Sequence, residues 1–225
     1  MSREDLLRSQ RDDVHSVLMP NLPRPLLVAA AQALGMGDGD ALTYTDTNQL
    51  AVCTDLALYG LPEGLQLVAA YVTSRPDIDP ALRAAMPAAA HALFQVGPAG
   101  SDGAVPCTPV RGGAPFTLLD PQLRQPEMAG LFVSAYIIPL PGHRITTGTP
   151  LAIHPDIVAR VKDRPDLRDA SLAASLALTQ WSYTTPRDTP PAQAPPPTAT
   201  GRKPSRNAPC HCGSGKRYKA CHGRR

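Results

Sequence analysis

The chain has 225 residues, of which 43% are hydrophobic and 18% are charged. This composition is typical of a chain that buries a core and excludes wholesale disorder. Its apolar stretches fall well short of the ~18 residues that suggest a membrane span, and the charged N-terminal stretch MSREDLLRSQRDD does not resemble a secretory signal. We therefore expect a cytoplasmic protein whose five cysteines are reduced or metal-bound, rather than a membrane protein or a secreted disulfide scaffold.

The formal charge of +3 combines two parts of opposite sign. Met1–Thr185 carries 13 Lys and Arg against 18 Asp and Glu, a net charge of −5, whereas Pro186–Arg225 carries 9 basic residues against one acid, a net charge of +8. Such asymmetry predicts a basic tail that is attracted to something acidic. Nucleic acid, an acidic protein surface and the chain's own acidic body all satisfy that description, and a tail that only aids solubility is a further alternative.

Helices are predicted at the start of the chain. Ser2 with Asp5 three residues later resembles a capping arrangement, and the apolar positions that follow recur at helical spacing: Leu6, Leu7, Val14, Val17 and Leu18. After a break at Pro20–Pro25, we expect a second short helix over Leu26–Leu34, ended by Gly35, and then a turn at Gly37–Asp40.

The middle of the body is predicted to be rich in strands. Leu50–Tyr59 and Leu65–Thr73 are apolar runs separated by Gly and Pro, which predicts a hairpin of buried strands. Asp79–Gln95 is predicted as a helix that Pro87 kinks or restarts. Gly97–Pro115 is expected to be a loop because it is rich in Gly and Pro.

The strongest predicted strand is Leu131–Leu140, which is rich in β-branched and aromatic residues. Pro155–Val161 and Asp166–Gln180 are predicted as closing helices. Together these elements predict an α+β body over residues 1–185, with a mostly antiparallel sheet flanked by helices.

A proline-rich linker is predicted over residues 186–206. Eight of the 24 residues in Pro186–Pro209 are proline, and none is Leu, Ile, Val or Phe. Proline fixes φ and removes a donor, so we expect an extended spacer of polyproline II character. A PxxP ligand for the aromatic groove of a partner is the less favoured alternative.

Metal-ligating residues gather at the end of the chain, in residues 207–225. Zn²⁺ prefers four thiolate or imidazole ligands in a tetrahedron, and the tail supplies such a set: Cys210, Cys212, Cys221 and His222. The intervening Gly213-Ser-Gly215 allows a tight turn that brings the two pairs together. His211 is the competing imidazole, but it lies between two ligands on one tight loop, so we expect it to point away. The sequence therefore predicts a closed, structural zinc knuckle.

A basic face accompanies the predicted zinc site. Lys216, Arg217 and Lys219 offset the negative charge that three thiolates place on a divalent ion. We expect these three residues to form the binding surface of the tail.

The C-terminal sequence RNAPCHCGSGKRYKACHG resembles the SEC-C zinc module. Its pattern is N-x-P-C-x-C-G-S-G-K-x-Y-K-x-C-H-G, and this chain departs from it only at His211, where the family often has Pro. The module occurs at the C-terminus of the SecA preprotein translocase and on many unrelated bacterial proteins. In the translocase it docks the chaperone SecB and contacts ribosomes or lipid, so the resemblance implies Zn²⁺ binding and a protein partner.

The body shows no recognisable catalytic constellation. His15, His91, His143 and His154 lack the companion spacing of known metal or nucleophile motifs. Cys53 is expected to be a small core residue, and Cys107 an exposed loop residue without an identifiable base. We therefore predict that the protein is not an enzyme, with an unrecognised hydrolase site as an alternative, since catalytic residues converge in space.

The order of the predicted body elements is similar to that of the suppressor-of-fused-like domain. The matching positions are Thr54, Leu58, Glu63 to Val68, His91 to Phe94, and Ile138 to Leu140. This resemblance implies an α+β protein-binding module, which in bacteria often serves as the immunity partner of toxins.

These features predict a non-catalytic bacterial protein-binding module, in one form a toxin-neutralising immunity protein, with the zinc tail as an auxiliary contact. The acidic body suits a basic partner. The alternative is an adaptor that binds SecB or ribosomes through the zinc tail. Non-specific nucleic-acid binding by the basic tail is a further alternative. Sequence-specific readout is not expected, because aromatic residues for base stacking are confined in the tail to Tyr218.

Overall fold

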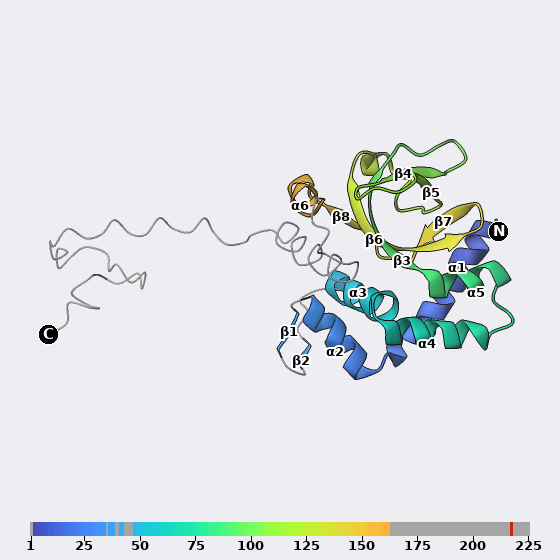
Figure 1. Ribbon diagram of the computed structural model, residues 1–225, viewed down its shortest axis with the longest axis vertical. Helices are drawn as coiled ribbons and strands as arrows, with labels where there is room; N and C mark the ends of the chain where they lie inside the picture. Colours follow the sequence, from blue (N-terminus) through green and yellow to red (C-terminus); the bar gives the residue numbers. More distant parts are fainter. Residues whose placement is uncertain (1, 35, 39–40, 43–46, 163–216, 218–225) are drawn as a thin grey trace. The chain divides into compact units, whose positions relative to one another are not determined.

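The computed structural model describes residues 2–34, 36–38, 41–42, 47–162 and 217 (Figure 1). The chain divides into two units, Met1–Thr185 and Pro186–Arg225, and every helix and strand labelled in Figure 1 belongs to the first. The closing helix predicted at Asp166–Gln180, the linker and the zinc ligands lie outside the described residues. Of the predicted tail surface only Arg217 is described, and it is exposed.

The predicted N-terminal helices are confirmed. Helix α1 (Arg3–Leu18) begins with a reciprocal capping box, in which the Asp5 amide donates to Ser2 Oγ at 3.1 Å and the Ser2 amide donates to Asp5 Oδ2 at 3.2 Å. A 3₁₀ turn, η1 (Met19–Asn21), separates it from α2 (Arg24–Ala33). Two short strands follow at the predicted turn, β1 (Gly37–Asp38) and β2 (Ala41–Leu42).

The predicted hairpin is wrong, because both of its segments are helical. Leu50–Tyr59 lies in α3 (Thr47–Asp55) and a π-helix, η2 (Leu56–Gly60), and Leu65–Thr73 lies in α4 (Pro62–Thr73). A helix buried on most sides reads as a continuous apolar run, which periodicity cannot distinguish from a buried strand. Gly64 permits this packing, because a Cβ there would lie 1.8 Å from the Ala57 carbonyl oxygen.

The prediction of one helix over Asp79–Gln95 is correct only for its first half. Helix α5 (Pro80–Ala85) passes into the 3₁₀ turn η3 (Met86–Ala88) at Pro87, where a kink or a restart was predicted. The chain then leaves as strand β3 (Ala90–Val96). Its inward residues, including the fully buried Phe94, belong to a sheet core and not to a helix face.

Strands β3 to β7 form a small closed barrel. β3 pairs with β4 (Val105–Pro109), β4 with β5 (Phe116–Leu118), β5 with β7 (His143–Thr146), and β7 with β6 (Phe132–Leu140), which pairs back to β3. The β5–β7 pairing is parallel and the others are antiparallel.

The elements beyond the barrel agree in part with the sequence. The 3₁₀ turn η4 (Pro126–Met128) precedes β6, strand β8 (Leu151–Ile153) extends the sheet beside it, and α6 (Pro155–Val161) lies where it was predicted. Strand β6 was also predicted. The expected loop Gly97–Pro115 is wrong in part, because it contains β4. Helices with a mixed, mostly antiparallel sheet agree with the α+β prediction, whereas the barrel closure was not predicted.

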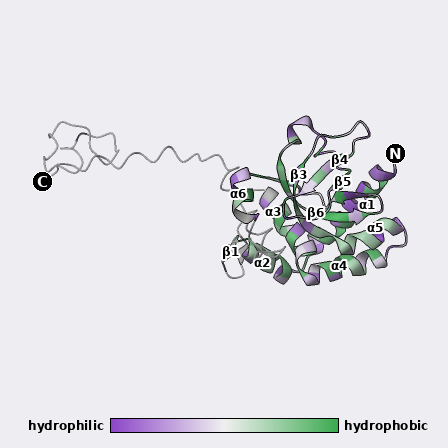
Figure 2. Ribbon diagram, turned by 45° about the horizontal axis from the view of Figure 1, so that its top comes forward, coloured by the Kyte–Doolittle hydropathy of each residue, from purple (hydrophilic) through white to green (hydrophobic). Residues whose placement is uncertain are grey.

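Strand β6 separates two hydrophobic cores. Alternate residues such as Ile138 and Leu140 pack in the cluster that contains the helices, whereas Val133 and Ile137 pack inside the barrel. Figure 2 colours much of the sheet as hydrophobic, whereas helices such as α4 show both hydrophobic and hydrophilic residues. In the described part of the chain, no helix is long and apolar enough to cross a membrane.

Candidate functional site

A buried acid, Asp55, lies at the junction between the helices and the barrel. It ends α3, is 3% exposed, and accepts a hydrogen bond on Oδ2 from Thr147 Oγ1 at 2.6 Å. Its Oδ1 atom is shielded from solvent and lacks a hydrogen-bond partner among the described residues. Burial raises the pKa of Asp55 to about 6, against the lowering effects of Thr147, Arg11 and Thr149.

Two arginines of α1 dock the helices onto the barrel. Arg11 Nη1 donates to the Thr146 carbonyl at 2.7 Å, and Arg8 Nη1 donates to the Leu119 carbonyl at 3.2 Å. Arg11 is only 8% exposed and forms an ion pair with Asp12 at 2.7 Å. Hydrogen bonds from a cation to carbonyl groups at the rim of the sheet fix the orientation of α1 on the barrel.

A histidine and a tyrosine extend this polar cluster. His15 Nε2 and the Tyr59 hydroxyl lie 2.6 Å apart in a buried hydrogen bond. Burial, with the positive charge of Arg11 as a second cause, lowers the pKa of His15 to about 4. Burial and the negative charge of Asp55 raise the pKa of Tyr59 well above its usual value. His15 is therefore neutral near pH 7.

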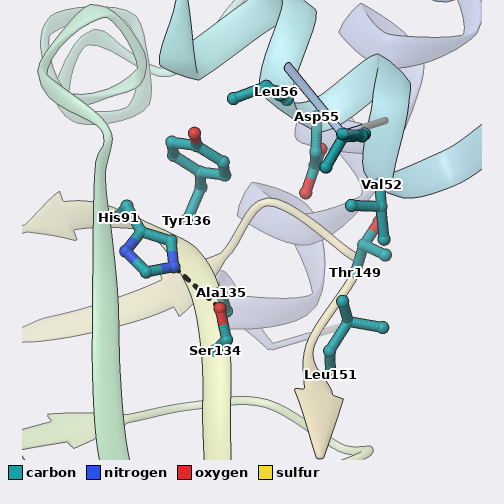
Figure 3. Close-up of a pocket in the computed structure, with 10 residues that line it drawn as sticks. Val52, Asp55, Leu56, His91, Ser134, Ala135, Tyr136, Thr149 and Leu151 are labelled. Atoms are coloured by element: carbon teal, nitrogen blue, oxygen red, sulfur yellow. Dashed lines mark hydrogen bonds between the residues drawn. The ribbon is translucent and has the colours of Figure 1, made fainter. Parts of the chain in front are cut away.

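A small cavity borders Asp55 on the barrel side (Figure 3). In the close-up the Asp55 carboxylate and the Tyr136 ring enter the same space from α3 and β6. His91 Nε2 and Ser134 Oγ lie 2.7 Å apart across β3 and β6, and the His91 and Tyr136 rings meet edge to face at 5.5 Å. The full lining is Leu34, Val52, Asp55, Leu56, His91, Ser134, Ala135, Tyr136, Thr149 and Leu151.

The cavity is too small for a substrate. Its volume of about 20 Å³ is room for about one water molecule. The His91–Ser134 pair has the spacing of a base and a nucleophile, but Ser134 is only 5% exposed. We therefore interpret the pair as a cross-strand contact of β3 and β6. The buried polar cluster beside it connects the helices to the barrel, and we call it the polar joint: Arg8, Arg11, His15, Asp55, Tyr59 and Thr147.

The two described cysteines are both buried. Cys53 lies in the helical core, as expected from the sequence, whereas Cys107 lies inside the barrel at 1% exposure and not in an exposed loop, so that expectation is wrong. Burial raises the pKa of Cys53 to about 11 and that of Cys107 to about 12, which disfavours the reactive thiolates.

The polar joint was missed in the sequence, although signals for it exist. Asp55 is a single charge inside the apolar run AVCTDLALYG, and Arg11 and His15 are four residues apart on the face of α1 that also carries Leu7 and Val14. Charged residues on an apolar face mark buried polar contacts.

The predicted metal ligands lie in the tail, and none of them is among the described residues. Within the described part of the chain, no group of three or more His, Cys, Asp and Glu side chains is placed to hold a metal ion. The tail supplies three thiolates and an imidazole, a donor set suited to Zn²⁺: Cys210, Cys212, Cys221 and His222.

Comparison with family models gives two matches. The SEC-C motif matches residues 206–224, which confirms the resemblance seen in the tail. A second model, described as a family of unknown function (DUF7986), matches residues 4–164. The comparisons with curated proteins and with solved structures gave no match.

The resemblance to the suppressor-of-fused-like domain is unconfirmed. Two of the segments that carried it, around Leu58 and Val68, are helical and not strands. The DUF7986 model covers both the helices of the polar joint and the whole barrel. The chain therefore belongs to the family of unknown function DUF7986 and carries a SEC-C motif at its C-terminal end.

Proposed function

We propose that this protein is a non-catalytic, cytoplasmic protein-binding module that holds Zn²⁺ in its SEC-C tail and contacts a partner through that tail. The observation that carries the proposal is the SEC-C match over residues 206–224, which includes all four candidate ligands. Cys210, Cys212, Cys221 and His222 would hold the ion in a closed site, where Zn²⁺ stabilises a fold and does not activate water.

The charges of the chain support a contact with an acidic partner surface. Lys216, Arg217 and Lys219 lie in the sequence between the proposed ligands Cys212 and Cys221, and Pro186–Arg225 as a whole carries a net charge of +8. Arg217 is exposed, as a contact residue must be. Clustered basic residues accelerate the encounter with an acidic surface and make the contact sensitive to salt.

Two classes of partner follow from this arrangement. The SEC-C match favours SecB or the ribosome, which the tail would contact directly. The net charge of −5 on Met1–Thr185 favours a basic partner for the body, such as a toxin that the protein neutralises. In the second case the tail is auxiliary, and a proline-rich linker over residues 186–206 would tether it to the body over residues 1–185.

Binding of the zinc-loaded full chain to purified SecB and to purified ribosomes tests the proposal. We expect saturable binding to one of them, and we expect Cys212→Ser to weaken it at least tenfold, because a structural zinc site folds the surface that makes the contact. His211→Ala is the matched control, since it removes an imidazole of the same loop that is not a proposed ligand, and it should bind as the unaltered chain does.

If the Cys212→Ser variant binds as tightly as the unaltered chain, the zinc tail is not part of the interface. If neither probe binds, the SecB and ribosome assignment is wrong. A basic nuclease toxin that binds equally to the zinc-loaded chain and to Cys212→Ser would instead assign binding to the acidic body.

A further inference from the structure

A second, larger cavity lies at one end of the barrel. It has a volume of about 360 Å³ and lies beside the β6–β7 hairpin, whose two-residue connection contains Gly142 at φ 81°. This volume falls within the range of small-molecule sites, and the mouths of β-barrels are common places for them. The cavity is lined by Pro115, Phe116, Thr117, Leu140, Gly142, His143 and Arg144.

The barrel core holds the Arg144 guanidinium in place. Its Cζ atom lies 4.4 Å from the centre of the Phe116 ring, and Phe116 packs edge to face on the fully buried Phe94 at 5.4 Å. The Arg144 carbonyl also accepts a hydrogen bond from the Leu119 amide at 2.9 Å. A guanidinium stacked on a fixed aromatic ring is pre-organised, so little side-chain freedom is lost when its N–H groups bind a ligand.

Arg144 also lacks an acidic partner among the described residues. Other arginines of the body form ion pairs, such as Arg75 with Asp77 at 2.6 Å and Arg11 with Asp12 at 2.7 Å. No carboxylate of the described residues lies within 4.0 Å of the Arg144 guanidinium, although its side chain is partly buried at the cavity. A partly buried cation without a counter-charge favours the binding of an anion.

A hydroxyl adds hydrogen-bonding capacity at the same cavity. His143 also lines the cavity, but its Nε2 atom is shielded from solvent and does not face the ligand space. Thr117 lines the cavity from β5 and carries a hydroxyl that can donate to an oxyanion. The cavity thus combines a fixed cation with a hydroxyl donor.

We propose that this barrel-mouth cavity binds a small ligand through an oxyanion group, a carboxylate or a phosphate, which the Arg144 guanidinium holds by paired hydrogen bonds. The planar fork of Arg matches two oxygens of either group. The site differs from the zinc tail and from the Asp55 cavity in its residues and its chemistry, and it does not depend on the proposed function.

Amide NMR spectra of the zinc-loaded full chain test this site, with inorganic phosphate titrated in one arm and acetate in the other at constant ionic strength. We expect saturable shifts at the amides of Thr117, Gly142 and His143 in at least one arm, and the arm that saturates at lower concentration identifies the oxyanion. Arg144→Gln should weaken that binding at least tenfold. Arg24→Gln, which removes an exposed arginine of α2, should leave it unchanged.

Residue-resolved shifts separate this cavity from the basic tail, which attracts anions too. Arg144→Lys serves as a second variant that keeps the charge and loses the fork, and we expect an intermediate affinity. The proposal is overturned if neither anion gives saturable shifts at these amides up to about 20 mM, a concentration beyond weak millimolar binding. Shifts that persist unchanged in a folded Arg144→Gln or Arg144→Lys variant would also overturn it.

Discussion

At the scale of single residues, the polar joint contains two groups whose titrations change the stability of the fold in opposite directions. Asp55 has a folded-state pKa of about 6, above the usual 3.8 of an aspartate, so its contribution to stability is present at low pH and is lost as pH rises through about 6. His15 has a folded-state pKa of about 4, below the usual 6.5 of a histidine, so its contribution is present above pH 6.5 and is lost as pH falls through about 4. Between about pH 4 and 6 the two effects offset each other.

In the Asp55→Asn variant, the effect of His15 titration on the free energy of unfolding should become visible, because the opposing effect of Asp55 is removed. The amide keeps an acceptor for Thr147 and does not ionise, so only the histidine effect remains. We expect the free energy of unfolding of the variant to rise by on the order of 3 kcal/mol between pH 4 and 6.5, whereas that of the unaltered chain stays nearly level. Urea unfolding across this pH range measures both.

The matched variant His15→Gln should show the opposite slope. Its amide can still hydrogen-bond the Tyr59 hydroxyl, and the remaining Asp55 effect lowers stability as pH rises from 4 to 6. If both variants show the pH profile of the unaltered chain, then Asp55 and His15 do not titrate as the structure indicates.

Between helical elements, the contact of η2 with α4 depends on the absence of a side chain at Gly64. A Cβ at this position would lie 1.8 Å from the Ala57 carbonyl oxygen and 2.8 Å from the Leu58 Cα atom. Both are backbone atoms, which cannot move aside as a flexible side chain could. The close approach of η2 and α4, beside the polar joint, therefore requires glycine at this position.

Gly64→Ala should destabilise the body by about 3 kcal/mol, because one of the two helices must shift to relieve the overlap. Gly130→Ala is the control: its φ of 87° strains any side chain, but a Cβ there meets no atom within 4 Å, so we expect a cost of about 1 kcal/mol. Thermal unfolding compares the two. Equal losses would show that close packing at Gly64 is not required.

The sequence predicted several elements that have end signals, but an end signal alone did not decide between helix and strand. The capping box at Ser2 and the proline at Pro155 mark helix starts, and the β-branched run of β6 marks a strand. Residues 50–73 were misassigned although Pro62 starts α4 as Pro155 starts α6, because nearly all of η2 is buried and an apolar run of this length fits a strand or a helix. The barrel closure was unpredictable, since it depends on the long-range β3–β6 pairing.

The sequence predicted one of the three candidate sites and missed the other two. The zinc ligands are close in sequence and have diagnostic spacing, so a short motif suffices to propose them. The polar joint joins α1, α3 and the residues after β7, and the barrel-mouth cavity joins β5 to the β6–β7 hairpin. Only the fold brings these residues together, and no local pattern could have placed Asp55 beside Thr147.

For the molecule as a whole, our main proposal is that the carboxyl-terminal tail is a zinc module attached to a DUF7986 body. Of the five cysteines, Cys53 and Cys107 are buried in the body, which leaves three for a metal site in the tail. A structural site of three thiolates and one imidazole has a fixed stoichiometry.

Metal analysis of the freshly purified full chain tests this proposal more directly than any binding assay. We predict one Zn²⁺ per chain, the same value for His211→Ala, and less than a tenth of it for Cys212→Ser and His222→Ala, because each of these two removes a ligand. A chain without stoichiometric zinc, or a Cys212→Ser variant that retains the full amount, would show that the tail is not the zinc module proposed.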